Sequence, residues 1–282
     1  MQRLRIYHLT EYSFSNQVTL NQHRLLLRPR EGHDVRIESS QLEIIPDYKI
    51  KWHRDEFDNS LALINFHQRT DKLIIASNVI IQHYAPEPFD FLLEEYAVYF
   101  PFTYAAEEQI NLAAFQQPIY LADRDIINNW ILPLALYGMG TFAMLLTLNQ
   151  AIYQQFRYQI REEAGVQSPA QTIILRSGSC RDYATLFIEA CRWMGLASRF
   201  VSGYLHAPAT EVGNASTHAW VEIYLPGTGW KGFDPTSGEV TSNQHIAVAV
   251  ARNPESVPPV SGSFIGLDPA ILKVNVQVNL LD

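Results

Sequence analysis

Short apolar runs fill residues 1–84, and they have the two-residue alternation that is typical of β-strands. Leu4 and Ile6 alternate with arginine and tyrosine, and the later runs are separated by turn-forming triplets such as Asp58-Asn59-Ser60. The other predicted strands of this region lie within residues 35–45, 61–66 and 73–81. Several short strands at this spacing predict an antiparallel, β-sandwich-like domain over residues 1–84.

A proline-rich step ends this region. Ala85-Pro86-Glu87-Pro88 places two prolines within three residues, which favours an extended connection and interrupts both helices and sheet ladders. The pattern of residues 89–121 is mixed and indicates neither a single helix nor a run of strands. We therefore predict a bridging segment over residues 85–122.

From Asp123 onward the apolar positions recur every three to four residues, which is the period of an amphipathic helix. One helix is predicted over Thr141–Arg161, a second begins after the N-cap pair Ser168-Pro169, and a third runs from Cys180 to a stop at Gly195. Strands are predicted afterwards at 198–204, 218–225, 230–234, 246–251 and 273–280. Together these elements predict an α+β core over residues 123–282, with the C-terminal strands included.

The composition narrows the class of protein. Of the 282 residues 47% are hydrophobic and 18% are charged, and the formal net charge is −8. An acidic chain without a cluster of lysine or arginine is unsuited to nucleic acid, because non-specific binding depends on neutralising phosphates. No stretch reaches the roughly 18 apolar residues of a membrane span, and the N-terminus lacks the apolar core of a signal peptide. We expect a cytoplasmic protein without a membrane partner, and the oligomeric state stays open.

The two cysteines, Cys180 and Cys191, differ in their expected surroundings. They lie roughly 16 Å apart along one predicted helix, whereas a disulfide needs Cα atoms within about 7 Å, so no disulfide joins them. Cys180 falls in the first helical turn, where unpaired N–H groups and the helix dipole favour the thiolate form. Cys191 falls on the apolar face in mid-helix, where cysteine is ordinarily a small buried hydrophobic residue. Cys180 is therefore the candidate nucleophile.

A histidine and an aspartate follow on predicted neighbouring strands. His218 lies in an alternating run and shares a face with Trp220. Histidine suits proton transfer near neutral pH, although a lone strand histidine is more often a structural group. Asp234 precedes the strand-ending Pro235 and can fix the tautomer of a histidine on the adjacent strand. A cysteine at a helix start, a histidine on a strand and an acid one hairpin later follow the papain-type order of nucleophile, base and orienter.

Four motifs carry a resemblance to a known family. They are Gly178-Ser179-Cys180-Arg181-Asp182-Tyr183-Ala184, Ser202-Gly203-Tyr204, His218-Ala219-Trp220-Val221-Glu222 and Gly229-Trp230-Lys231-Gly232-Phe233-Asp234-Pro235-Thr236. Together they resemble the bacterial transglutaminase-like superfamily, whose members include cysteine-protease-like proteins with an N-terminal β-domain. Residues 7–12 and 24–29 resemble that β-domain, and residues 245–252 and 257–262 resemble the C-terminal segment of the same subfamily. Relatives usually have Gly-Asn where this chain has Asp58-Asn59, a turn in which both pairs tolerate a positive φ.

The resemblance implies a papain-like core in which a helix carrying Cys180 packs on an antiparallel sheet carrying His218 and Asp234. It implies acyl transfer at amide bonds through a thioester, from a glutamine carboxamide to an amine. Hydrolysis of a peptide or amide by the same three residues is the alternative, and a non-catalytic peptide-binding module is a third possibility. In each case the expected partner is a protein or peptide.

The remaining candidate site residues are expected to line the substrate channel. They are Trp220, Tyr204, Trp230 and Asp182, although the three aromatic residues suit a hydrophobic core equally well. No cofactor is implied. We also expect no metal site, because His206 and His245 lack ligand partners at a suitable spacing along the chain.

The hairpin between the histidine and aspartate strands provides a geometric test of this hypothesis. A two- or four-residue turn centred on Gly227-Thr228 would pair Asp234 with Val221, on the face away from His218. The two side chains meet only if the loop has an odd number of residues or a bulge intervenes. A regular hairpin with an even loop would exclude Asp234 as the orienter.

Overall fold

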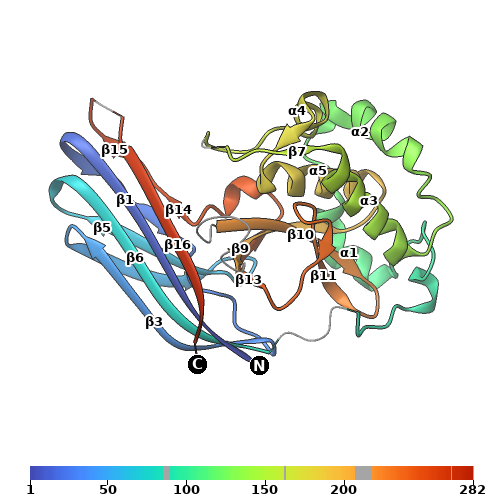
Figure 1. Ribbon diagram of the computed structural model, residues 1–282, viewed down its shortest axis with the longest axis horizontal. Helices are drawn as coiled ribbons and strands as arrows, with labels where there is room; N and C mark the ends of the chain where they lie inside the picture. Colours follow the sequence, from blue (N-terminus) through green and yellow to red (C-terminus); the bar gives the residue numbers. More distant parts are fainter. Residues whose placement is uncertain (85–88, 162, 207–216, 268, 282) are drawn as a thin grey trace.

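The protein has a strand-rich lobe beside a lobe in which helices surround a central sheet, hereafter the β-domain and the core (Figure 1). The computed structural model describes residues 1–84, 89–161, 163–206, 217–267 and 269–281. The predicted proline-rich step at 85–88 therefore lies outside the described residues. Among the helices of the described ranges, none combines the length and apolarity needed to cross a membrane.

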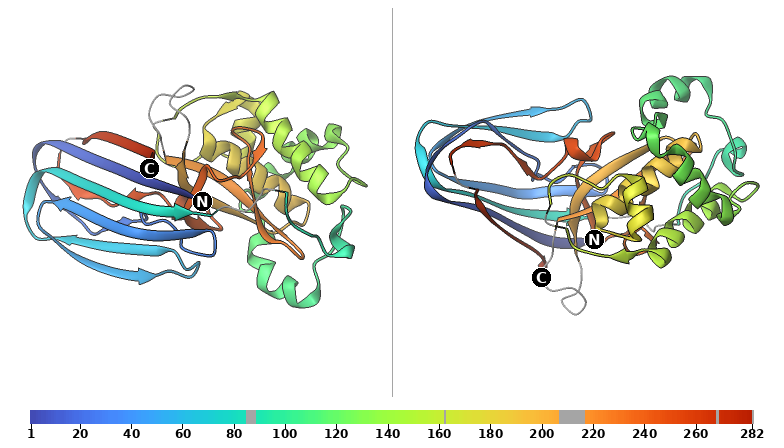
Figure 2. Two further views of the ribbon diagram at one scale, coloured as in Figure 1. Left: turned by 60° about the horizontal axis from the view of Figure 1, so that its bottom comes forward. Right: turned by 90° about the horizontal axis from the view of Figure 1, so that it is seen from above.

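The β-domain consists of two antiparallel sheets that lie against each other (Figure 2). The first has the strand order β15-β1-β6-β3, with β16 also paired to β1, and the second has the order β14-β2-β5-β4. The strands are β1 (Gln2–Leu20), β2 (His23–Leu25), β3 (Val35–Ile45), β4 (Tyr48–Arg54), β5 (Ser60–Phe66), β6 (Arg69–His83), β14 (Val260–Ser261), β15 (Phe264–Ile265) and β16 (Ile271–Leu281).

An apolar layer fills the space between these two sheets. From Leu73 onward β6 alternates strictly between buried and half-buried residues, and Leu73 and Ile75 point into the layer. They belong to one buried cluster with Phe14 of β1 and with Leu25 and Ile64 of the second sheet. The predicted sandwich is confirmed, because each amphipathic strand has one apolar face to bury and the facing sheet covers it.

The C-terminal strands belong to the β-domain and not to the core. β16 pairs with β1 along its whole length, with Leu281 opposite Arg3, and it buries Val276 and Val278. The predicted core over residues 123–282 is therefore wrong in including the C-terminal strands β14, β15 and β16. Alternation along a strand shows which of its faces is buried, but it does not specify which sheet edge the strand joins.

The core is built around a five-stranded antiparallel sheet with the order β12-β11-β10-β9-β13. Its strands are β9 (Ser198–Leu205), β10 (Thr217–Leu225), β11 (Gly229–Asp234), β12 (Glu239–Val240) and β13 (His245–Ala251). Its helices are α1 (Ala106–Gln116), α2 (Arg124–Ile131), α3 (Thr141–Gln155), α4 (Pro169–Leu175) and α5 (Cys180–Trp193). Helix α5 packs on β9 and β10 and places Phe187 in the main apolar cluster, so the sheet supports the cysteine-bearing helix.

The helix boundaries follow local signals where those signals are strong. Ser168 caps α4 as predicted, since its Oγ accepts the Gln171 N–H at 3.2 Å. Helix α3 ends at Gln155, six residues before the predicted Arg161, because Phe156 adopts an extended conformation while keeping its ring buried. Helix α1 lies inside the predicted bridging segment, where only one of its side chains is buried and the periodic signal is correspondingly weak.

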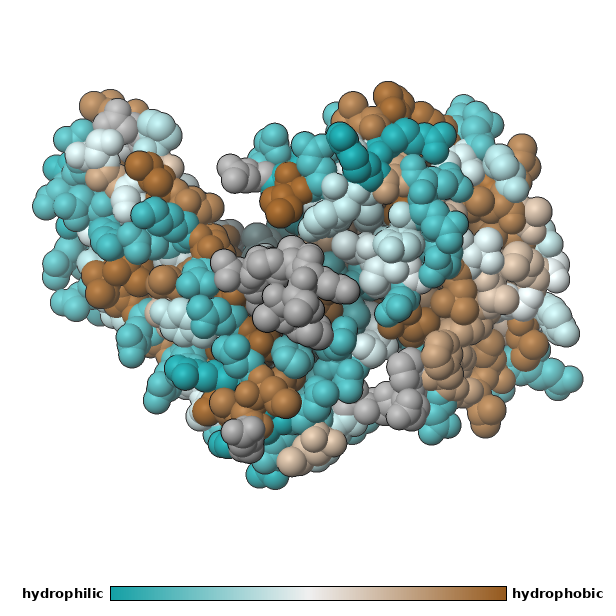
Figure 3. Space-filling model, in the orientation of Figure 1, coloured by the Kyte–Doolittle hydropathy of each residue, from teal (hydrophilic) through white to brown (hydrophobic). Residues whose placement is uncertain are grey.

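The two lobes share one apolar cluster, in which Leu4 and Ile81 of the β-domain join Ile246 of the core. The fully buried Asn59 adds polar contacts, because its Nδ2 donates to the Val250 carbonyl at 2.8 Å and its Oδ1 accepts the Val250 N–H at 2.9 Å. The preceding Asp58 has a φ of 60°, which is the conformation expected where relatives carry glycine. In the view of Figure 3 the surface is indented between the two lobes at the top, and the lobes are in contact below this indentation.

A buried histidine also bridges the lobes and makes stability depend on pH. Nδ1 of His8 lies 3.0 Å from the Tyr204 hydroxyl, and burial lowers the pKa of His8 from 6.5 to about 4. Below pH 6.5 His8 becomes protonated in the unfolded chain but stays neutral in the folded chain. The free energy of unfolding should therefore fall by about 3 kcal/mol as pH drops toward 4. In denaturant titrations across this pH range, the free energy of unfolding should fall less for His8→Gln than for the unaltered protein. His53→Gln, at an exposed position of β4, is the control, and equal slopes in all three proteins would contradict the prediction.

Candidate active site

Cys180 is the first residue of α5, and a short parallel ladder fixes the chain just before it. β8 (Ser177–Gly178) pairs with β7 (Arg157–Tyr158), and the Gln159 N–H donates to the Gly178 carbonyl at 2.8 Å. The Cys180 residue is 8% exposed, so its thiol has narrow access to solvent. It lies at the helix N-terminus, where the first N–H groups have no partner within the helix and favour a nearby negative charge.

Asp182 holds the first turn of α5 to the preceding chain. Its Oδ2 accepts the Ser179 N–H at 2.8 Å and the Ser179 Oγ–H at 2.9 Å. Its Oδ1 accepts from Arg161 at 2.8 Å and from the Gln167 N–H at 2.7 Å. Gly178 is required beside it, since a Cβ there would lie 2.9 Å from the Asp182 Cβ. Asp182 is 0% exposed, so the predicted contact with substrate is wrong and its role is structural.

The β10–β11 hairpin has the odd loop that the triad hypothesis requires. Leu225 pairs with Gly229, which leaves the three-residue loop 226–228. The register continues to place Asp234 opposite Trp220, on the same face as His218. Nε2 of His218 consequently lies 2.7 Å from Oδ2 of Asp234.

Charge in this buried site stabilises the protonated form of His218. Burial alone lowers the pKa of His218, but the charge and hydrogen bond of Asp234, followed by the hydrogen bond and charge of Cys180, raise it to about 10. Burial raises the pKa of Asp234, but His218 and His245 outweigh this and hold it well below its usual range. Because Asp234 occupies Nε2 of His218, the ring nitrogen left to contact Cys180 is Nδ1.

Tyr158 is a neighbour of the thiol that the sequence did not reveal. Burial raises the pKa of the Tyr158 phenol above its ordinary range, and the charge and hydrogen bond of Cys180 add to the effect. Tyr158 lies opposite Gly178 in the β7–β8 ladder, so its side chain belongs to the electrostatic surroundings of Cys180. In the sequence Tyr158 falls inside a predicted helix, and only the pairing of β7 with β8 brings it to the site.

His245 is the second residue that sequence reasoning missed. Its Nε2 lies 3.1 Å from Oδ2 of Asp234, the same oxygen that contacts His218. One ligand atom from each of the three side chains lies within 4.8 Å of the others, a spacing at which a metal ion can be held. The expectation that His245 lacks partners is therefore wrong, because the pairing of β13 with β9 brings it beside Asp234. In this structure two hydrogen bonds to Asp234 already engage both histidines.

Comparison with known families gives this geometry its context. Residues 138–235 match the family model of the transglutaminase-like superfamily, and residues 4–82 match that of the bacterial transglutaminase-like N-terminal region. The chain belongs to the transglutaminase-like superfamily. The core match contains Cys180, His218 and Asp234.

Relatives of this transglutaminase-like protein match nearly its full length or only a short part of it. An uncharacterized protein of Mycobacterium tuberculosis H37Rv is 26% identical over 98% of this chain and 92% of its own. The protein-glutamine gamma-glutamyltransferase of Pseudomonas aeruginosa is 37% identical, but the match covers 22% of this chain and 10% of that protein. The crystal structure of a candidate cysteine protease from Cytophaga hutchinsonii aligns with a TM-score of 0.79, covering 100% of this chain and 91% of that chain at 18% identity, and it supports the fold.

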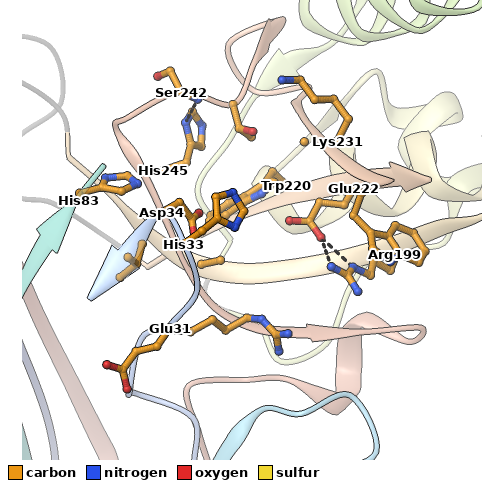
Figure 4. A pocket seen from close by; sticks show the side chains of 16 residues that line it. Glu31, His33, Asp34, His83, Arg199, Trp220, Glu222, Lys231, Ser242 and His245 are labelled. Atoms are coloured by element: carbon orange, nitrogen blue, oxygen red, sulfur yellow. Dashed lines mark hydrogen bonds and ion pairs between the residues drawn. The ribbon is translucent and has the colours of Figure 1, made fainter. Parts of the chain in front are cut away.

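The predicted channel residues of this transglutaminase-like protein have different surroundings. Tyr204 is 1% exposed and contacts His8, so it joins the two lobes and does not reach a substrate. Trp220 and Trp230 line a cavity of about 400 Å³ where the β-domain meets the core (Figure 4). Charged and imidazole side chains from both lobes complete its wall, among them Glu31, His33, Asp34, Lys231 and His245. Contact of the two tryptophans with substrate stays a prediction.

The network around Asp182 should be a main source of stability. Asp182→Ala would remove the close, buried partner of the Arg161 charge, so we expect the free energy of unfolding to fall by about 3–5 kcal/mol. The matched control is Glu163→Ala, because Glu163 pairs with the same arginine at 3.6 Å but is 74% exposed. That variant should change stability little. Equal losses in the two variants, measured by denaturant unfolding, would contradict the assignment.

Proposed function

We propose that this protein is a cysteine-dependent acyltransferase acting on amide bonds, with Cys180 as nucleophile, His218 as acid and base, and Asp234 as orienter. The observation that carries the proposal is the position of His218. It bonds Asp234 through Nε2 at 2.7 Å, and Cys180 is among the groups that raise its pKa, so one ring interacts with both the acid and the thiol. Membership of the transglutaminase-like superfamily supports the same assignment.

The first half of the reaction forms a thioester. The Cys180 thiolate attacks the amide carbonyl carbon, a C–S bond forms, and the carbonyl oxygen becomes an oxyanion. The first N–H of α5, on Cys180 itself, is placed to donate to that oxyanion. As the oxyanion collapses, the C–N bond breaks and the leaving nitrogen takes the proton from the His218 imidazolium. For a glutamine side chain the product that leaves is ammonia.

The second half regenerates the enzyme. An incoming amine gives a proton to His218 and attacks the thioester carbon, the C–S bond breaks, and the thiolate returns. Water in place of the amine gives hydrolysis. We favour the amine as acceptor because a segment of this chain resembles part of a protein-glutamine gamma-glutamyltransferase. The cysteine and histidine are also 8% and 7% exposed, which limits the access of water.

The substrate class in this proposal is a protein or peptide that presents a glutamine side chain. The deciding experiment incubates the protein with a glutamine peptide library and an isotope-labelled primary amine, followed by mass spectrometry. We expect incorporation of the amine with loss of ammonia. Deamidation or chain cleavage without incorporation would identify a hydrolase instead. If the protein binds peptides but catalyses neither reaction, it is a non-catalytic binding module.

A further inference from the structure

The hydrogen bonds around His245 define its tautomer. Nδ1 of His245 accepts the Ser242 N–H at 3.2 Å, so this nitrogen carries no proton. The ring proton therefore lies on Nε2, which faces Oδ2 of Asp234 at 3.1 Å. His245 is thus a neutral donor to the carboxylate, whereas His218 is the partner that exchanges protons.

The protein holds this donor firmly. His245 begins β13, and the turn before it is closed by a hydrogen bond from its own N–H to the Ser242 carbonyl at 3.0 Å. The indole of Trp220 packs edge-on against the His245 ring at 5.2 Å between centroids and stacks on His218 at 6.2 Å. Gly203 leaves space for that indole, since a Cβ there would lie 2.5 Å from its ring. The His245 side chain is 7% exposed.

Every oxygen of Asp234 is consequently engaged. Oδ1 accepts the Thr236 N–H at 2.8 Å, and Oδ2 accepts from both histidines. Without His245 the carboxylate would keep one bond on each oxygen and could rotate about its Cβ–Cγ bond. A carboxylate fixed from three directions holds the His218 ring at one orientation relative to Cys180.

We propose that His245 is a positioning residue for the reaction of Cys180, acting through Asp234 on the orientation of His218. This role rests on the proposed function, but the contacts of His245 with Asp234 do not depend on the substrate. His245 also lines the cavity between the lobes (Figure 4), so it links that cavity to Asp234.

The test uses iodoacetamide, which reports on the activated thiol without any substrate. We expect His245→Ala to lower the rate of Cys180 alkylation at pH 6 by roughly tenfold, the lower end of what supporting hydrogen bonds to functional histidines contribute. His245→Gln can place its Nε2 amide near the former imidazole Nε2 and should recover most of the rate. The control is His33→Ala, which removes an exposed imidazole from the same cavity and should leave the rate unchanged.

A double variant separates positioning from a general structural effect. If His245 acts through Asp234, adding His245→Ala to Asp234→Ala should slow alkylation no further. Circular dichroism and thermal unfolding establish that each variant is folded. Wild-type alkylation in His245→Ala, or an additional loss in the double variant, would overturn the proposal. If the protein turns over no glutamine peptide but its variants show the expected alkylation rates, the proposed function is rejected and the inference about His245 stands.

Discussion

Cys180→Ala should lower amide turnover by a factor of about 10³ or more, because no other group in the site can form the thioester. The measurement is the rate of labelled-amine incorporation into the glutamine peptide that responds best. Intact-mass spectrometry of the unaltered protein should also detect the acyl adduct. The fold should survive, since Cys180 is small and lies at a helix end and not in the centre of the apolar cluster.

Cys191→Ala is the matched control for this prediction. The second cysteine lies on the same helix but is 0% exposed and packed in the main apolar cluster. Its removal should cost about 1 kcal/mol of stability and leave the turnover of the folded protein intact. Retention of turnover by Cys180→Ala, or its loss in a folded Cys191→Ala protein, would reject Cys180 as the nucleophile.

Alkylation should discriminate between the same two cysteines by a factor of about 100 or more. At pH 6 the His218 imidazolium is present beside Cys180, because the pKa of His218 is raised to about 10. Burial raises the pKa of Cys191 far above its ordinary range and also blocks access to its sulfur. An ordinary free thiol is under about 1% ionised at this pH, so rapid labelling reports an activated thiolate.

Peptide mapping after a limiting amount of iodoacetamide gives the ratio directly. His218→Ala should slow the labelling of Cys180, because it removes the imidazolium that pairs with the thiolate. Equal labelling of both cysteines is the outcome that contradicts the prediction. A Cys180 rate that ignores His218 and rises only near pH 8.5 would likewise mean that the thiol is not activated.

The parts of the site that the sequence predicted are those that local pattern defines. Cys180 follows a recognisable helix start, and His218 and Asp234 flank one short hairpin, so their mutual position depends only on loop length and register. His245 reaches Asp234 only because β13 pairs with β9, and Tyr158 reaches the site only because β7 pairs with β8; no local signal specifies either pairing. Asp182 was misassigned because a buried carboxylate that stabilises a helix start and an exposed one that binds substrate look alike in a motif.

The same distinction holds for the fold. Alternation identified most of the strands and the sandwich they form, because the sequence of each strand shows which of its faces is buried. The sequence of a strand does not show which strand it pairs with. β16 was therefore recognised as a strand and assigned to the wrong lobe, since its edge of β1 lies far away in sequence.

The pairing of β16 with β1 determines the order in which the protein can be completed during synthesis. β1 and β6 can form their ladder early, but the other edge of β1 stays open until the whole core and then residues 271–281 have left the ribosome. An open edge is a template for strands of other chains. Nascent and truncated chains are thus exposed to mispairing at β1, and chaperone dependence should be concentrated in this interval of translation.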